Sequence, residues 1–259
     1  MTLKDRVAIV TGGGNGIGAG ISEHLASKGA IIAVFDINLN DANRTAEKIK
    51  QRGGNATVYK VDVTNKTEVN NAVDAVLAKE GKIDILVNNA GTDVKGAITE
   101  IEESTWDLMM NLNLKGVFFM TQAVTKSMIK NKSGRIINIS SMAGKTGEPF
   151  TSPYCATKFG VIGFTQSLGL ELGEHNITVN AVCPGAVDTE LIKKSITGSA
   201  KLSGRSYDEE LYEKFLKLTP LGRLAKPLDV AKAVAFLASD DAEYITGSSI
   251  NVSGGREMH

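Results

Sequence analysis

Hydrophobic and polar positions follow two alternating patterns along the chain. Short apolar runs, each of strand length, recur at residues 7–10, 31–35, 56–59, 83–87, 135–139, 178–182 and 249–252. Between them lie stretches in which apolar residues return every three or four positions, as at Ile21, Leu25 and Ala26. That spacing is typical of an amphipathic helix. The chain is therefore predicted to alternate strands with helices.

The predicted strands are apolar on both faces, which is typical of a parallel sheet covered by helices on each side and joined by right-handed crossovers. The expected fold is a single-domain, Rossmann-type, doubly wound α/β fold, in which a seven-stranded parallel sheet carries helices on both faces over residues 1–259. Ligands of such folds bind outside the carboxyl ends of the strands. Functional residues are therefore expected directly after each apolar run.

One region, residues 187–221, departs from this alternation. The residues that interrupt its helical pieces are Gly198, Ser199, Ser203, Gly204 and Ser206. Long insertions in compact domains are usually functional or disordered. A substrate lid over residues 187–221 is therefore expected, and a plain surface excursion is the alternative.

Composition and charge exclude several classes of partner. Lys plus Arg equal Asp plus Glu at 29 each, so no net field attracts nucleic acid or an anionic membrane surface. The sequence contains no apolar stretch of the roughly 18 residues that a membrane helix needs and no signal-peptide pattern. Two cysteines, Cys155 and Cys183, cannot form a disulfide framework. We expect a cytoplasmic protein that binds neither nucleic acid nor membrane.

A glycine-rich turn follows the first predicted strand. Gly12, Gly16 and Gly18 lie between that strand and a helical pattern, where a dinucleotide pyrophosphate can rest on the helix N-terminus. Ala19 follows Gly18, so the Gly-Lys-Ser/Thr of a triphosphate-binding loop is missing. Because a tight turn without a ligand also uses glycine, the cluster alone leaves both interpretations open.

Asp36, at the end of the second predicted strand, favours the dinucleotide. An acid at this place accepts hydrogen bonds from the adenosine ribose hydroxyls. Its charge repels the 2′-phosphate of NADP, and neither Asn15 nor Ile37 supplies a compensating cation. The sequence therefore predicts NAD as the cofactor. The alternative is that Asp36 is a solvated loop acid or a helix cap.

Four motifs make the chain resemble the short-chain dehydrogenase/reductase family along essentially its whole length. They are the turn at residues 11–18, Asn-Asn-Ala-Gly at residues 88–91, Ser141 with Tyr154 and Lys158, and Pro184-Gly185 followed by Thr189. Each is modest alone, but they occur in the family's order and after the expected strands. Within the family, the chain looks most similar to NAD-dependent polyol, polyol-phosphate and acetoin dehydrogenases.

The expected chemistry can also be argued from the residues themselves. Tyr154 and Lys158 stand one helical turn apart, so their side chains share a face. Free tyrosine has a pKa of about 10, and a neighbouring ammonium should favour the phenolate and make Tyr154 a better acid/base. Ser141 would hydrogen-bond the substrate oxygen as its charge changes, and Ser140 is the less favoured candidate.

The resemblance implies further roles. Lys158 would grip the nicotinamide ribose, and Asn113 would hold a water that links Lys158 to solvent. The residues expected to contact the cofactor are Gly12, Asn15, Gly16, Ile17, Gly18, Asp36, Asp62, Val63, Asn89, Ala90, Gly91, Tyr154, Lys158, Pro184, Gly185, Val187 and Thr189. Asp62 could instead cap a helix, and Asn89 could chiefly bond strand backbone. A homotetramer is implied through helices at about residues 105–131 and 152–174.

The expected function is NAD(H)-dependent hydride transfer between nicotinamide and a small secondary alcohol or ketone, such as a polyol, a polyol phosphate or acetoin. No metal is expected, because the three histidines are scattered. The alternatives are a hydroxysteroid or 3-oxoacyl reductase and a non-enzymatic NAD-binding module. Lys193, Lys194, Lys201 and Arg205 in residues 187–221 could close over a substrate phosphate, although exposed cations are usually only solvated.

Overall fold

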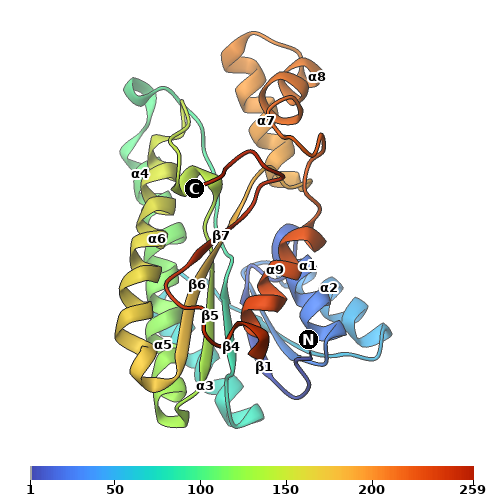
Figure 1. The fold of residues 1–259 in the computed structure, drawn as a ribbon, viewed down its shortest axis with the longest axis vertical. Helices are drawn as coiled ribbons and strands as arrows, with labels where there is room; N and C mark the ends of the chain where they lie inside the picture. Colours follow the sequence, from blue (N-terminus) through green and yellow to red (C-terminus); the bar gives the residue numbers. More distant parts are fainter. Residues whose placement is uncertain (1) are drawn as a thin grey trace.

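The computed structural model describes residues 2–259, which build one α/β unit around a central sheet (Figure 1). Within these residues, seven parallel strands lie in the order β3-β2-β1-β4-β5-β6-β7. The strands are β1 Val7–Thr11, β2 Ile31–Asp36, β3 Asn55–Lys60, β4 Ile85–Asn88, β5 Gly134–Ile139, β6 Ile177–Pro184 and β7 Ser249–Val252. The predicted Rossmann-type fold is confirmed.

Burial explains why the central strands read as continuous apolar runs. Every residue of β1, β4, β5 and β6 is buried. Ile9 of β1 pairs in parallel register with Ala33 on one side and Leu86 on the other. A strand in this position contacts helices on both faces, so both sets of alternating side chains must be apolar.

The helices form two layers, one on each face of the sheet (Figure 1). A core cluster on one face packs helices α1 (Gly16–Ser27), α2 (Leu39–Gln51) and α9 (Pro227–Ala238) against the strands. A second cluster on the other face does the same for α3 (Lys66–Glu80), α5 (Gly116–Asn131) and α6 (Ser152–Leu172). The spacing of apolar residues in each helix places its buried stripe on the sheet.

Asparagine caps fix where three of these helices begin. Asn15 accepts a hydrogen bond from the first helical N–H of α1, and Asn38 and Asn65 do the same for N–H groups of α2 and α3. A side-chain oxygen at this position satisfies a backbone donor that has no partner within the helix. The shorter helical segments are η1 Ile98–Glu100, α4 Glu103–Met110, η2 Asn111–Lys115, η3 Met142–Gly144, η4 Gly173–His175 and η6 Asp240–Ala242.

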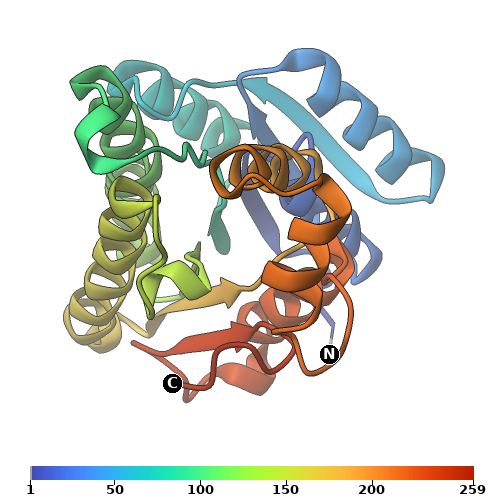
Figure 2. The same cartoon turned by 90° about the horizontal axis from the view of Figure 1, so that it is seen from above.

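Residues 187–221, which we call the lid segment, stand beyond the carboxyl ends of the strands (Figures 1 and 2). They fold as α7 (Glu190–Ser203), α8 (Tyr207–Glu210) and a π-helical turn, Leu211–Leu216. Seen from above, these helices cross the middle of the sheet's edge (Figure 2). Within residues 2–259, no helix is both long and apolar enough to cross a membrane.

Candidate active site

The glycine-rich turn leads from β1 into α1 and brings its backbone into close contact. Gly12 and Gly16 have positive φ angles of 58° and 52°, which side chains other than glycine rarely adopt. A Cβ on Gly18 would lie 2.0 Å from the carbonyl oxygen of Gly12. These constraints keep the N-terminus of α1 free of side chains, so the turn fits a cofactor pyrophosphate.

Thr11 and Asn89 tie this turn to the end of β4. The hydroxyl of Thr11 accepts hydrogen bonds from the backbone N–H groups of Asn89 (2.9 Å) and Ala90 (3.0 Å). The side-chain amide of Asn89 donates to the carbonyls of Thr11 (3.0 Å) and Gly12 (3.1 Å). Asn89 therefore chiefly bonds backbone and shapes the cofactor turn, while a ribose contact stays a prediction.

Asp36 lies at the carboxyl end of β2, next to the turn. Its two carboxylate oxygens accept hydrogen bonds from the backbone N–H groups of Gly14 and Asn38, each at 2.9 Å. The carboxylate is thus held in one orientation beside the glycine turn. Each oxygen keeps a second lone pair that could accept a ribose hydroxyl.

Two other predicted cofactor residues follow β3. Asp62 accepts hydrogen bonds from the backbone and hydroxyl of Thr64, and α3 is capped by Asn65. The side chain of Val63 is buried in the apolar cluster beneath α3 and α5. A cofactor contact through Val63 would have to use its backbone.

The predicted acid/base residues meet where β5 and α6 approach each other. The ammonium of Lys158 lies 5.6 Å from the centroid of the Tyr154 ring and donates a hydrogen bond to the Ile139 carbonyl at 2.9 Å. Ser141, two residues after the end of β5, lies within hydrogen-bonding reach of the Tyr154 phenol. Ser140 instead donates to the Lys158 carbonyl at 2.9 Å and is buried, so Ser141 is the serine placed to meet a substrate.

Burial controls the protonation of both residues. It lowers the pKa of Lys158 to about 8, against the opposing effects of Cys183 and Asp93. Burial also raises the pKa of Tyr154, and the charges of Asp93 and Glu148 add to this, while Ser141 opposes it. At neutral pH the phenol therefore carries its proton and the lysine is mostly charged. The expectation that the neighbouring ammonium shifts Tyr154 towards the phenolate is not met, because burial raises the pKa of Tyr154 and only Ser141 lowers it.

Asn113 holds the catalytic elements together. Its side-chain oxygen accepts from the backbone N–H of Thr92 at 2.9 Å, and its amide donates to the Thr92 carbonyl at 2.9 Å and to Thr157 at 3.3 Å. These bonds join the π-helical turn Asn111–Lys115 to the loop after β4 and to α6. Both amide hydrogens are thereby used, so a water-binding role for Asn113 stays a prediction.

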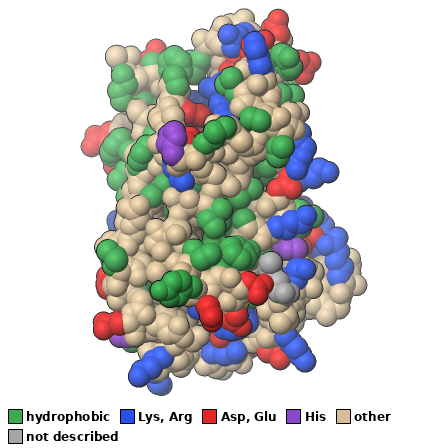
Figure 3. Space-filling view, in the orientation of Figure 1, with side chains coloured by type: hydrophobic (Ala, Val, Ile, Leu, Met, Phe, Trp, Pro, Cys, Tyr) green, Lys and Arg blue, Asp and Glu red, His purple; other side chains and the backbone are tan. Residues whose placement is uncertain are grey.

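These groups surround one cavity of about 320 Å³ at the carboxyl edge of the sheet. In Figure 3 the surface is hollowed near the top, beside the lid segment, and side chains of both charges are visible in the hollow. The predicted residues that line it are Gly12, Asn15, Gly16, Ile17, Asn89, Ala90, Gly91, Ser141, Tyr154, Lys158, Pro184, Gly185, Val187 and Thr189. Gly18, Asp36, Asp62, Val63 and Asn113 lie outside this lining.

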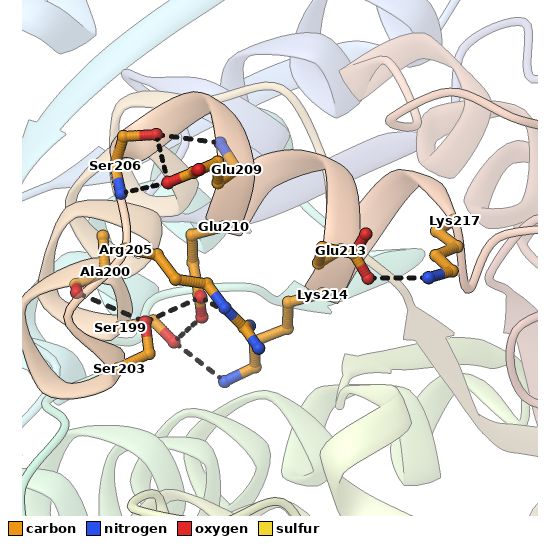
Figure 4. Close-up of polar contacts among 10 residues, drawn as sticks. All are labelled: Ser199, Ala200, Ser203, Arg205, Ser206, Glu209, Glu210, Glu213, Lys214 and Lys217. Atoms are coloured by element: carbon orange, nitrogen blue, oxygen red, sulfur yellow. Dashed lines mark hydrogen bonds and ion pairs between the residues drawn. The ribbon is translucent and has the colours of Figure 1, made fainter.

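A buried carboxylate holds the lid segment together (Figure 4). Glu210 accepts hydrogen bonds from Ser199, from Ser203 at 2.9 Å and from Arg205 at 3.2 Å. Lys214 donates to the Ser199 hydroxyl at 3.0 Å. Arg205, one of the four predicted lid cations, is thus paired within the lid segment.

The other three lid cations also lie outside the cavity lining. Lys193 pairs with Glu190 at 2.8 Å, and Lys193, Lys194 and Lys201 are all exposed. None of these three residues, nor Arg205, lines the cavity. The structure therefore gives no support to a phosphate clamp built from the four predicted cations.

The substrate end of the cavity contains residues that the sequence did not single out. They are Asp93, Lys95, Glu148, Ser195 and Phe215. Asp93 and Lys95 could have been found from the sequence, because both are charged and lie within four residues of the Asn-Asn-Ala-Gly motif at residues 88–91. Within residues 2–259, no three His, Cys, Asp or Glu side chains are grouped in a way that could hold a metal ion.

Comparison with known proteins identifies the family to which the chain belongs. The family model for short chain dehydrogenases matches residues 6–200. The chain belongs to the short chain dehydrogenase family. As a member, it is an oxidoreductase that binds a nicotinamide cofactor and interconverts a CH–OH group and a ketone in a small molecule.

The relatives within the family are named for different substrates. The chain is 37% identical to 3-oxoacyl-acyl-carrier-protein reductase FabG of Thermotoga maritima, covering 98% of this chain and 99% of the relative. It is 40% identical to the (S)-acetoin-forming diacetyl reductase of Staphylococcus epidermidis, covering 96% and 98%. The crystal structure of levodione reductase superimposes with a TM-score of 0.92 at 30% identity, covering 98% of both chains.

Proposed function

We propose that this short chain dehydrogenase is an NAD(H)-dependent oxidoreductase of small secondary alcohols and ketones, with Tyr154 as the proton donor and acceptor. The observation that carries the proposal is the meeting of Ser141, Tyr154 and Lys158 in the cavity that the cofactor turn also lines. The bound nicotinamide supplies or accepts the hydride.

The roles of the three side chains follow from their contacts. Ser141 donates a hydrogen bond to the substrate oxygen, where negative charge grows during reduction. Tyr154, which burial keeps protonated, delivers its proton to that oxygen as the hydride reaches carbon. The Lys158 ammonium beside the ring stabilises the phenolate left behind. In alcohol oxidation the same steps run in reverse.

The preference for NAD rests on Asp36. Hydrogen bonds from Gly14 and Asn38 hold its carboxylate beside the turn, where it would repel a 2′-phosphate. Asn15 is neutral, and Ile37 is 63% exposed and carries no charge. Nothing at these two positions offsets the repulsion.

For the substrate, we propose a polyol, a polyol phosphate or an acetoin-like ketone. The name of the diacetyl reductase supports an acetoin-like substrate, and polar side chains at the substrate end of the cavity favour an oxygen-rich molecule. The FabG relative keeps a 3-oxoacyl substrate as the second candidate. A cytoplasmic location fits the two buried, unpaired cysteines.

We also propose a homotetramer formed through α4, α5 and α6. These helices expose large apolar side chains, including Trp106, Phe118, Phe159 and Leu170. A contiguous apolar patch formed by such side chains marks an interface. Light scattering at micromolar concentration should give four times the chain mass, and a monomer would contradict the proposal.

A panel assay tests the function. NADH oxidation is followed with diacetyl, acetoin, dihydroxyacetone, a 3-ketosteroid and acetoacetyl-CoA, and NAD⁺ reduction with the corresponding alcohols. We expect turnover of diacetyl or of a small polyol, with NADH preferred to NADPH. A clear preference for acetoacetyl-CoA would favour the 3-oxoacyl alternative, and no turnover with any compound would contradict the proposal.

A further inference from the structure

Lys95 is a cation at the substrate end of the cavity without a protein acceptor. It lies in the loop after β4, is partly buried, and lines the cavity together with Asp93 and Glu148. Its ammonium lies 5.9 Å from the centroid of the Phe215 ring. Among residues 2–259, no hydrogen bond and no ion pair within 4.0 Å engages this ammonium. A partly desolvated cation in this state favours an acceptor from outside the chain.

Two further cations surround the same aromatic ring. The ammonium of Lys214 lies 6.0 Å from its centroid, and the guanidinium of Arg256 lies 5.5 Å from it. Lys214 has a neutral partner, Ser199. Arg256 pairs with Glu148 only at 3.6 Å, and its Nη1 is buried without a hydrogen-bond partner. Phe215 thus gathers three positive charges at one end of the cavity.

Carboxylates nearby do not fully offset this charge. Glu148 faces Arg256. One oxygen of Asp93 accepts from Ser195 at 3.4 Å, and its other oxygen is buried without a hydrogen-bond partner. Glu210 is engaged by Arg205 and by two serines in the lid segment. Burial lowers the pKa of Lys95 and Lys214 acts in the same direction, while Asp93, Glu148 and Glu210 oppose both. With Arg205, four cations therefore lie among three carboxylates, Asp93, Glu148 and Glu210, which leaves an excess of one positive charge.

We propose that Lys95 binds an anionic group, a carboxylate or a phosphate, carried by the substrate in addition to its reacting carbonyl or hydroxyl. The inference rests on the proposed function, in which Tyr154 and Ser141 hold the reacting oxygen in the same cavity. A neutral hydroxyl would leave the ammonium uncompensated, whereas an anion forms a charge-assisted hydrogen bond with it. Lys214 and Arg256 add a favourable field without having to touch the substrate.

Two matched pairs of ketones test the charge preference. Acetoacetate is compared with 4-hydroxy-2-butanone, which has a hydroxymethyl group in place of the carboxylate. Dihydroxyacetone phosphate is compared with dihydroxyacetone. The kcat/KM of each is measured with NADH for the wild type, Lys95→Gln, Lys95→Arg and a control, Lys194→Gln. Lys194 is an exposed lysine of the lid segment and lies outside the cavity.

The readout is the ratio of kcat/KM for the anionic ketone to that for its neutral partner. In at least one pair, the wild type should favour the anion, and Lys95→Gln should lower the ratio about tenfold or more. Lys95→Arg should keep most of the ratio, and Lys194→Gln all of it. The pair that responds identifies the anion as carboxylate or phosphate. A ratio that Lys95→Gln leaves unchanged in both pairs, or a wild type that prefers both neutral ketones, overturns the inference.

A binding measurement separates this inference from the proposed function. The Tm of each variant is measured with and without malonate and inorganic phosphate. A rise in Tm that occurs in the wild type and in Lys194→Gln but not in Lys95→Gln supports the anion subsite, even if none of the four ketones is reduced. Such a result without turnover would count against the proposed function alone. Equal Tm shifts in all variants overturn the subsite whether or not ketones are reduced.

Discussion

Replacing Gly18 by alanine tests how the cofactor turn is held. Gly18 lies in the first turn of α1, and an added Cβ would sit 2.0 Å from the Gly12 carbonyl oxygen and 2.5 Å from the Asn89 side-chain nitrogen. The carbonyl belongs to the backbone of the turn, so a side-chain rotation cannot relieve the contact. The Asn89 amide that would be displaced also bonds the carbonyls of Thr11 and Gly12.

The expected magnitude follows from two opposing effects. Alanine in place of glycine in a helix gains about 0.5–1 kcal/mol. Overpacking a tight site costs about 1–3 kcal/mol, and Gly18 lies at the severe end because the clash involves backbone. A net loss of about 2 kcal/mol corresponds to a Tm lower by about 4–8 °C for a chain of this size. The shifted turn should also weaken cofactor binding about tenfold or more.

Gly198 provides a matched control. It is also an interior helical glycine, in α7, but apart from its two chain neighbours and the backbone of its own helix no atom lies within 4 Å of where its Cβ would be. Calorimetry and a titration of NADH fluorescence should show a lower Tm and a higher Kd for Gly18→Ala, and neither change for Gly198→Ala. If the two variants behaved alike in both measurements, the steric account of the turn would be refuted.

Three further predictions concern charge. Lys158→Met should abolish turnover yet raise stability at pH 7. In the wild type, the lowering of the lysine pKa from 10.5 to about 8 destabilises the folded state by about 3 kcal/mol at pH 7, and methionine removes this cost. The variant also loses the hydrogen bond to Ile139, which offsets about 1 kcal/mol of the gain. Because the unfolded chain binds more protons between these pKa values, wild-type stability rises as the pH rises from about 8 towards 10.5. The Tm advantage of Lys158→Met should shrink over that range, and a constant difference would contradict the account. Asp36→Ala combined with Ile37→Arg should raise the NADPH/NADH ratio of kcat/KM about tenfold or more, and an unchanged ratio would remove Asp36 as the discriminator. Glu210→Ala should speed hydrogen exchange in residues 190–216, because the lid segment loses its buried acceptor; unaltered exchange would show that other contacts hold these helices.

The fold was predictable because its signals are local. A strand such as β5 is buried along its whole length. Its consecutive residues are therefore mostly apolar, and this run can be recognised in the sequence alone. The lid segment was harder to predict, because Gly198 and Ser199 suggested interruptions. In the structure α7 continues through both, since Gly198 has open space around it and Ser199 bonds the distant Glu210.

The candidate site likewise has one part that could be predicted from the sequence and one part that could not. Ser141, Tyr154 and Lys158 could be recognised because they form a spaced motif on consecutive elements. The substrate end depends on contacts between residues far apart in sequence, as when Lys95 and Arg256 meet at the Phe215 ring. No periodic pattern marks such a contact. For Asn89 the sequence left a ribose contact and backbone bonding both open, and the structure shows that its amide bonds the carbonyls of Thr11 and Gly12.

The most direct test of the central claim is hydride transfer by Tyr154→Phe. The ring, its packing and the cofactor turn stay, while the transferable proton of the phenol is lost. The account predicts a fall in kcat of about a hundredfold or more, with the Kd for NADH within about twofold of the wild type. A variant that kept activity within about tenfold of the wild type would show that Tyr154 is not the acid/base, and would contradict the account.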